Sequence, residues 1–225
     1  MINRQRIEDV ARHLQRDVYK SRSLMCKFDA HPLTMLRPEI AAEFLDFDYY
    51  TLESIPSDTF GMEVGGILDL PGHAMHISDK FKFQTRRFTA AHELGHILLH
   101  PQLAHGLAHR DIPISEMIFY KRPHIEQEAD YFAACYLIPR KQLELEFFSR
   151  FGNSPIRLNE TSAFRLGAKT VSDFFIEPSG GLKFASAAST TCTYGGYGFE
   201  SLVQKFQVSV SAMSIRLKEV GLVAD

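Results

Sequence analysis

The sequence has no apolar run that approaches the roughly 18 residues needed for a membrane-spanning helix. Its first residues, 1–9, are polar and of mixed charge, and they lack the apolar core of a secretory signal. These two absences argue against a membrane protein and against a secreted protein. We therefore expect a soluble protein of the cytoplasm.

Cysteine is scarce, and neither sign of charge dominates. The three cysteines are far apart, odd in number and without a CxxC pair, so they favour reduced thiols over a disulfide framework. The net charge of −2 gives no overall attraction to nucleic acid. Hydrophobic residues, by contrast, make up 45% of the sequence, which is typical of a folded globular protein. The length of 225 residues is enough for one well-packed domain, or for a main domain with a small appendage.

Hydrophobic spacing predicts helices and a hairpin in the first third of the chain. A first amphipathic helix is predicted by apolar residues three and four apart: Ile7, Val10, Leu14 and Val18. Pro38 is well placed to begin a second, short helix. Apolar stretches at 62–70 and 74–77 flank Pro71 and Gly72, which predicts a β-hairpin with its turn at this pair.

Two longer helices are expected in the middle of the chain. Thr89 is the expected cap of the first, and Pro101 bounds it. Residues 101–123 contain three prolines and little periodicity, so we expect a surface loop there. The second helix is expected over 123–138, and Pro139 stops it.

The last quarter of the chain is expected to change from irregular to helical. Residues 178–198 are rich in Gly, Ser and Thr, so they predict an irregular connection. Residues 199–223 return to helical spacing. Early strands followed by late helices predict an α+β fold with a small sheet.

Residues 92–96 read His-Glu-Leu-Gly-His, an HExxH pattern. On a helix, positions i and i+4 share one face, so the imidazoles of His92 and His96 can bind one tetrahedral Zn²⁺ ion. Glu93 projects about 100° away from His92, and there it can take a proton from the attacking water. Gly95 leaves one side of the helix bare, which permits another backbone to approach closely.

A third metal ligand is expected from the segment 126–130, which reads Glu-Gln-Glu-Ala-Asp. Catalytic zinc commonly takes two histidines and one glutamate, and both Glu126 and Glu128 are candidates. On a helical wheel Glu126 falls inside the apolar arc, where a carboxylate is costly unless it meets a cation. This favours Glu126 as the ligand over Glu128. Asp130 shares its face and is expected to accept the free ring N–H of His92 or His96.

Further histidines compete for the metal. His100 continues the i+4 series, but it lies about 12 Å along the helix axis from His92, which is too far to share one ion. We expect the remaining histidines of this region to line the cleft or the surface: His105, His109 and His124. Any of these, or Tyr131, is a candidate donor to the oxyanion.

The two motifs, in this order, resemble the ImmA/IrrE family of bacterial and phage metallopeptidases. The resemblance is carried by residues 87–100, by 126–134 and by the Leu-Ile-Pro at 137–139. The segment 202–222 resembles that family's helix-turn-helix-like segment. Where the family typically ends its ligand helix in Leu-Leu-Met-Pro, this chain has Tyr-Leu-Ile-Pro, which is a conservative change.

The resemblance implies a fold and a domain organisation. It implies a zincin-like metallopeptidase domain over residues 1–180, with its motif core at 60–140. A helix-turn-helix-like segment at 199–225 would pack on or beside this domain.

The resemblance also implies a chemistry and a substrate class. It implies His92, His96 and Glu126 as ligands of Zn²⁺ and Glu93 as the catalytic base. Members of the family relieve repression by cleaving helix-turn-helix transcriptional repressors at one site, often in phage, mobile-element or stress regulons. We therefore expect a protein substrate of this kind.

Two rival functions remain open. In the first, a DNA-binding regulator, residues 206–209 are a turn between two helices, with Ser209 or Ser211 as the cap of the second helix. Residues 199–225, however, hold three basic and three acidic side chains, which argues against direct DNA binding. The second rival is an antitoxin or other binding protein that keeps the zincin fold without proteolysis.

Overall fold

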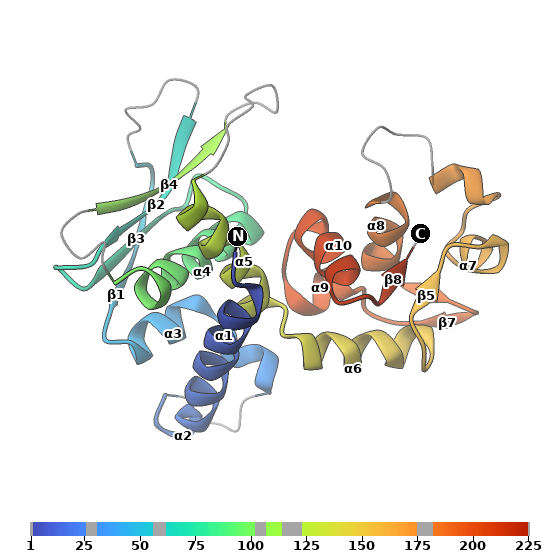
Figure 1. Cartoon of the computed structure of the whole chain (residues 1–225), viewed down its shortest axis with the longest axis horizontal. Coiled ribbons are helices and arrows are strands. Elements are labelled where there is room, and N and C mark those ends of the chain that lie inside the picture. Colours follow the sequence, from blue (N-terminus) through green and yellow to red (C-terminus); the bar gives the residue numbers. More distant parts are fainter. Residues whose placement is uncertain are drawn as a thin grey trace. The chain divides into compact units, whose positions relative to one another are not determined.

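The computed structural model describes residues 2–25, 31–55, 62–101, 107–113, 123–174 and 182–224 (Figure 1). The chain divides into two compact units, Met1–Leu137 and Ile138–Asp225. The catalytic domain predicted over residues 1–180 stays a prediction. No helix in the described ranges is long and apolar enough to cross a bilayer.

The first unit holds both motifs. Its elements, in chain order, are α1 (Arg4–Lys20), α2 (Arg22–Met25), η1 (Pro32–Met35), α3 (Pro38–Phe44), β1 (Asp48–Leu52), β2 (Met62–Asp69), β3 (Ala74–Ser78), α4 (Phe83–Leu99), β4 (Leu107–Pro113) and α5 (His124–Leu137). Strands and helices together make this unit α+β, as predicted. The helices expected from Pro38 and over 123–138 are confirmed as α3 and α5.

A four-stranded sheet has the order β1-β3-β2-β4. β2 pairs with β3 and β4 in antiparallel fashion, and β1 pairs with β3 in parallel. The predicted hairpin is confirmed, with Asp69 opposite Ala74. The Asp69 carboxylate accepts the N–H of Gly72 at 2.9 Å, which holds the turn closed.

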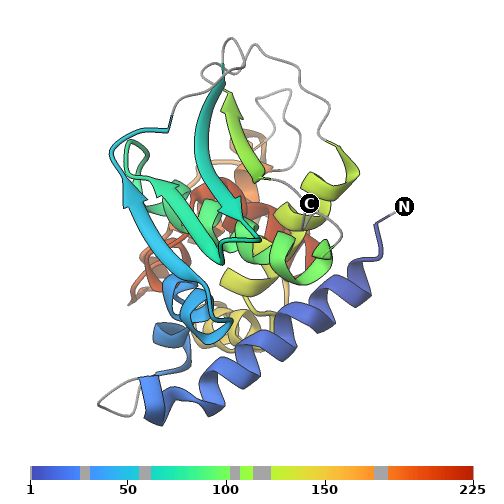
Figure 2. The ribbon, with the colours of Figure 1, turned by 90° about the vertical axis from the view of Figure 1, so that its left-hand side faces the viewer.

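The helices of this unit form layers beside the sheet (Figure 2). α4 contacts strands β2, β3 and β4, α5 packs on α4, and α1 packs on α5. The inward face of α1 consists of Ile7, Ala11, Leu14 and Val18, whereas Val10 is partly exposed. The Gln15 amide donates to the carbonyl oxygens of Cys135 and Tyr136, both at 2.9 Å, and so satisfies acceptors at the end of α5.

The start of α4 corrects the prediction. The helix begins at Phe83, with Lys82 as its N-cap residue, and Thr89 is buried in its middle. Thr89 has the side chain of a good cap, but residues 83–88 contain no Gly or Pro to break the helix. The helix therefore continues upstream of the expected start.

The loop expected over 101–123 is also partly wrong. Residues Leu107–Pro113 form β4, which pairs with β2 so that Pro113 lies opposite Met62. Backbone pairing with a neighbour creates this edge strand, and Pro is tolerated at its end. The remainder of the loop, 102–106 and 114–122, and with it His105, lies outside the described residues.

The second unit is mostly helical. It contains α6 (Arg140–Phe151), β5 (Ile156–Arg157), α7 (Glu160–Arg165), η3 (Val171–Phe174), α8 (Leu182–Thr190), β6 (Thr193–Tyr194), β7 (Tyr197–Gly198), α9 (Leu202–Phe206), α10 (Val210–Glu219) and β8 (Val223–Ala224). The irregular connection expected over 178–198 is wrong for α8 and for the β6–β7 hairpin. Small residues explain α8, since they allow it to pack closely on α10, where the Ser186 and Ser214 hydroxyls lie 3.1 Å apart.

The helical ending is present as α9 and α10. Gln207 joins them in the left-handed conformation, with φ of 55°. Ser209, one of the two predicted caps, accepts the N–H of Ala212 at 3.2 Å. The helix-turn-helix character of this pair stays a prediction.

Candidate metal centre

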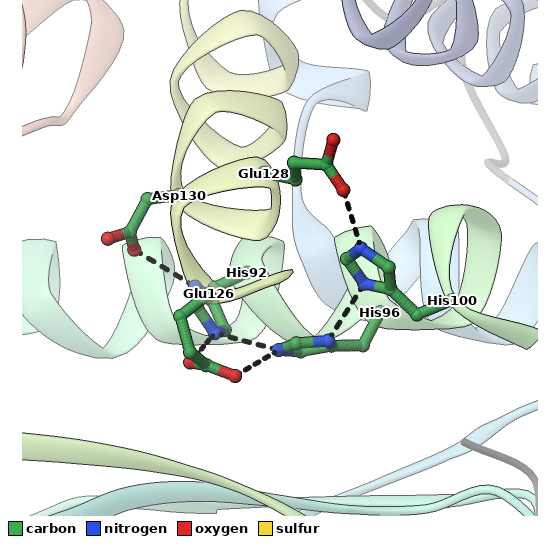
Figure 3. A network of polar contacts seen from close by, with 6 residues as sticks. All are labelled: His92, His96, His100, Glu126, Glu128 and Asp130. Carbon is green, nitrogen blue, oxygen red and sulfur yellow. Dashed lines mark hydrogen bonds and ion pairs between the residues drawn. The ribbon is translucent and has the colours of Figure 1, made fainter. Parts of the chain in front are cut away.

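Helix α4 carries the HExxH motif in a fully enclosed position. The side chains of His92, Glu93 and His96 are 0–1% exposed. Buried imidazoles and carboxylates need polar partners, because an isolated polar group in the interior costs several kcal/mol. Helix α5 supplies these partners for the two histidines (Figure 3).

Three nitrogen and oxygen atoms converge where α4 meets α5. The Nε2 atoms of His92 and His96 lie 3.0 Å apart. The Glu126 carboxylate reaches them with Oε2 at 3.1 Å from His92 and Oε1 at 3.2 Å from His96. Donors around a tetrahedral zinc ion, with bonds near 2.1 Å, stand about 3.4 Å apart. The spacing and the donor set therefore fit one zinc ion bound by these three residues.

The charge of Glu126 suits a metal ligand. Burial raises the pKa of this carboxyl, but its close contacts with the rings of His92 and His96 outweigh burial and hold the pKa well below its usual range. The carboxylate is thus anionic near neutral pH and supplies a negative charge to a cation. Its side chain keeps 19% exposure.

Asp130 lies at the outer side of His92. Its Oδ1 is 2.9 Å from His92 Nδ1, while Nε2 of the same ring faces Glu126. A neutral imidazole carries one proton, so Nδ1 donates to Asp130 and Nε2 keeps its lone pair for a metal. This is the position in which the sequence expected Asp130.

Glu128, the other candidate ligand, has a different partner. Its Oε2 lies 3.1 Å from Nε2 of His100, and its Oε1 lies 3.6 Å from Nδ1 of His124. His100 in turn places Nδ1 at 3.1 Å from Nδ1 of His96. Sequence reasoning missed this link, although the spacing of His96 and His100 by four residues on one helix was its visible signal.

His100 is nearly as enclosed as the motif itself, at 2% exposure. Burial lowers its pKa below the usual range, and the hydrogen bond to Glu128 opposes this effect only in part. A neutral imidazole is therefore the favoured form of His100 near pH 7.

Glu93 lies between α4 and the sheet. A Cβ placed on Gly66 of β2 would be 3.1 Å from Glu93 Oε1 and 2.8 Å from Thr89 Cγ2. The pairing of β2 with β4 shifts register between Val64 and Gly66, which is a β-bulge. Gly66, which the sequence did not single out, thus leaves room for the Glu93 carboxylate.

Gly95 sets the distance between the two motif helices. A Cβ at this position would lie 3.1 Å from Cα of Ala129 and 3.2 Å from Cδ1 of Phe132. The bare side predicted for α4 is therefore the side on which α5 approaches. This contact brings Glu126 within reach of both histidines.

Comparison with known proteins agrees with this geometry. Residues 52–154 match the family model of the IrrE N-terminal-like domain, Peptidase_M78. The matched range includes both the HExxH helix and Glu126. No curated protein and no solved structure matches the chain. The sheet, the HExxH helix and the ligand helix accordingly make up a zincin-like core, and the chain carries a metallopeptidase domain of the Peptidase_M78 family.

Proposed function

We propose that this chain is a zinc-dependent metalloendopeptidase in which His92, His96 and Glu126 hold the metal. The observation that carries the proposal is the convergence of their donor atoms to separations of 3.0–3.2 Å. Two imidazoles and one carboxylate leave the fourth position of a tetrahedral ion for water or substrate, as in catalytic zinc sites.

Bound zinc would act as a Lewis acid that polarises the scissile carbonyl and activates water near neutral pH. Glu93 accepts a proton from the attacking water and passes it to the departing amine. Asp130 fixes the ring of His92 with Nε2 toward the metal, through the 2.9 Å contact to Nδ1.

The substrate in this proposal is a helix-turn-helix transcriptional repressor, cut at one site so that repression ends. The support is the family to which residues 52–154 belong, together with the motif order from α4 to α5. A regulatory protease of this type acts where repressors act, so we place it in the cytoplasm and in a phage, mobile-element or stress regulon. Direct DNA binding by residues 199–225 is not part of the proposal.

Metal analysis of purified protein tests the site. We expect about one zinc ion per wild-type chain and a large loss in His96→Ala and in Glu126→Ala, because each variant leaves two protein ligands. Elemental analysis after gel filtration measures the content. Full zinc retention in Glu126→Ala would remove this residue from the ligand set, and a wild-type chain that stays free of metal after reconstitution would contradict the proposed function.

A further inference from the structure

A line of three polar side chains, two of them buried histidines, leads from the metal centre back to helix α5. It runs from His96 to His100 and ends at Glu128, with both contacts at 3.1 Å (Figure 3). His96 and His100 are 1% and 2% exposed, and the Glu128 side chain is 22% exposed. Neither contact involves an atom assigned to the metal, since both lie on the far side of the His96 ring from Nε2, so they call for a separate explanation.

The positions of the ring protons fix which atom donates and which accepts at each contact of this line. When Nε2 of His96 is directed at a cation, the single ring proton of a neutral imidazole sits on Nδ1. That N–H donates to Nδ1 of His100, which must then be the acceptor. His100 consequently carries its own proton on Nε2 and donates it to Oε2 of Glu128. Each ring proton thus has one acceptor, and the line ends on the Glu128 carboxylate, which only accepts.

Packing alone does not account for this arrangement. The rings of His96 and His100 are tilted by 49° with centroids 5.1 Å apart, and their nitrogens face each other. An aliphatic or phenyl side chain at position 100 would fill the same space without accepting a proton. His96 would then keep a buried N–H without an acceptor, which costs about 1–3 kcal/mol.

We propose that His100 and Glu128 are positioning residues that hold His96 in the tautomer and orientation required to bind the metal. They do for His96, through two groups, what Asp130 does for His92 directly. The inference rests on the proposed zinc site and adds to it a pair of residues outside the ligand set. Loss of such supporting hydrogen bonds typically weakens metal binding by about 10–100-fold.

Zinc affinity of the full-length chain tests the inference without any activity assay. The dissociation constant is measured by chelator competition on metal-free protein, and the visible spectrum of the Co²⁺-substituted protein reports the geometry of the ligands. His100→Phe removes the acceptor and is expected to weaken zinc binding about tenfold or more and to change the Co²⁺ spectrum. Glu128→Ala is expected to weaken binding in the same direction.

A conservative variant and a matched control distinguish the loss of the hydrogen bond from a change in side-chain size. In His100→Asn the side-chain oxygen stands close to the former Nδ1, so it accepts the His96 N–H and should restore most of the affinity and the wild-type spectrum. His124→Ala removes the histidine on the other oxygen of Glu128 and should leave the affinity within about twofold, well short of the losses expected for supporting residues. Circular dichroism checks that each variant is folded. If His100→Phe is not folded, the zinc affinities of Glu128→Ala and His124→Ala decide whether the positioning role holds.

The outcomes separate this inference from the proposed function. Wild-type zinc binding with a weakened Glu128→Ala and a rescued His100→Asn supports the positioning role. Wild-type affinity in Glu128→Ala, or in a folded His100→Phe, overturns that role and leaves the zinc site standing. A wild-type chain that does not bind zinc or Co²⁺ overturns the proposed function and the inference with it.

Discussion

The carboxylate of Glu93 lies against Gly66, whose lack of a side chain leaves room for it. Gly66 has no Cβ, and the position of that missing atom is 3.1 Å from Glu93 Oε1. Glu93 itself is 0% exposed, so bulk solvent does not touch its carboxylate. Such enclosure strengthens electrostatic interactions, since the local dielectric is low.

Exchange of this carboxylate for an amide tests its role. Glu93→Gln keeps the shape but cannot accept the proton, so we expect zinc content to stay at the wild-type level and cleavage to fall by about 10²–10⁴-fold or more. A panel of purified helix-turn-helix repressors, with fragments identified by mass spectrometry, gives the activity. Glu63→Gln, which removes a surface carboxylate bonded to Lys80, is the control. Undiminished cleavage by Glu93→Gln would show that another group is the base.

Gly66→Ala tests the space beside that carboxylate. The new methyl group would stand 2.8 Å from Thr89 Cγ2, and the β-branched, buried Thr89 cannot turn away easily. We expect a loss of about 1–3 kcal/mol in unfolding free energy, as for overpacked cores, together with lower cleavage. Urea denaturation measures the first effect. Gly198→Ala, with nothing within 4 Å of its Cβ, should be nearly neutral, and an equally neutral Gly66→Ala would contradict this account.

At the scale of elements, the site depends on how closely α4 and α5 approach. Helix α4 has both histidines on one face and α5 carries Glu126, but only the contact between the helices joins the histidines to Glu126. Gly in a helix interior costs about 1 kcal/mol relative to Ala. At Gly95 a side chain would meet the backbone of α5, because the Cβ position lies only 3.1 Å from Cα of Ala129.

Gly95→Ala sets these two effects against each other. Ala favours the helix, but its methyl group meets the backbone of Ala129 and the ring of Phe132. We expect the contact to dominate, because a backbone atom cannot rotate away, and to lower the unfolding free energy by about 1–3 kcal/mol. Zinc affinity should fall as well, because Glu126 moves with α5. Chelator competition and urea denaturation measure both, and a more stable variant with unchanged affinity would contradict the prediction.

At the scale of the whole molecule, zinc should link folding to metal binding. The three ligands come from two helices, so an unfolded chain offers no preformed site and the ion stabilises the folded state. Free zinc at a hundredfold excess over its dissociation constant adds about 2.7 kcal/mol. We expect the Tm of wild-type protein to rise with zinc concentration in thermal scans and to fall after chelation. His96→Ala should show little of this shift, and an equal shift in both proteins would mean that zinc acts elsewhere.

Local patterns in the sequence were sufficient for much of the first unit. The i, i+4 spacing of His92 and His96 and the place of Glu126 on the apolar arc predicted the cluster that the structure forms. The hairpin at Pro71 and Gly72 was likewise local. Such predictions succeed because helix and turn periodicity place side chains relative to their near neighbours in the chain.

Other features followed only from the packing of distant segments. β4 exists as a strand because β2 lies beside it, and its own sequence has no strand periodicity. The sequence of α8 has a composition typical of loops, so the helix was not predicted. Its small residues are explained by close packing on α10. The sequence by itself thus determined which residues are the candidate metal ligands. Tertiary structure decided that Glu128 meets His100 and that Gly66 faces Glu93, because those distances depend on which surfaces are brought together.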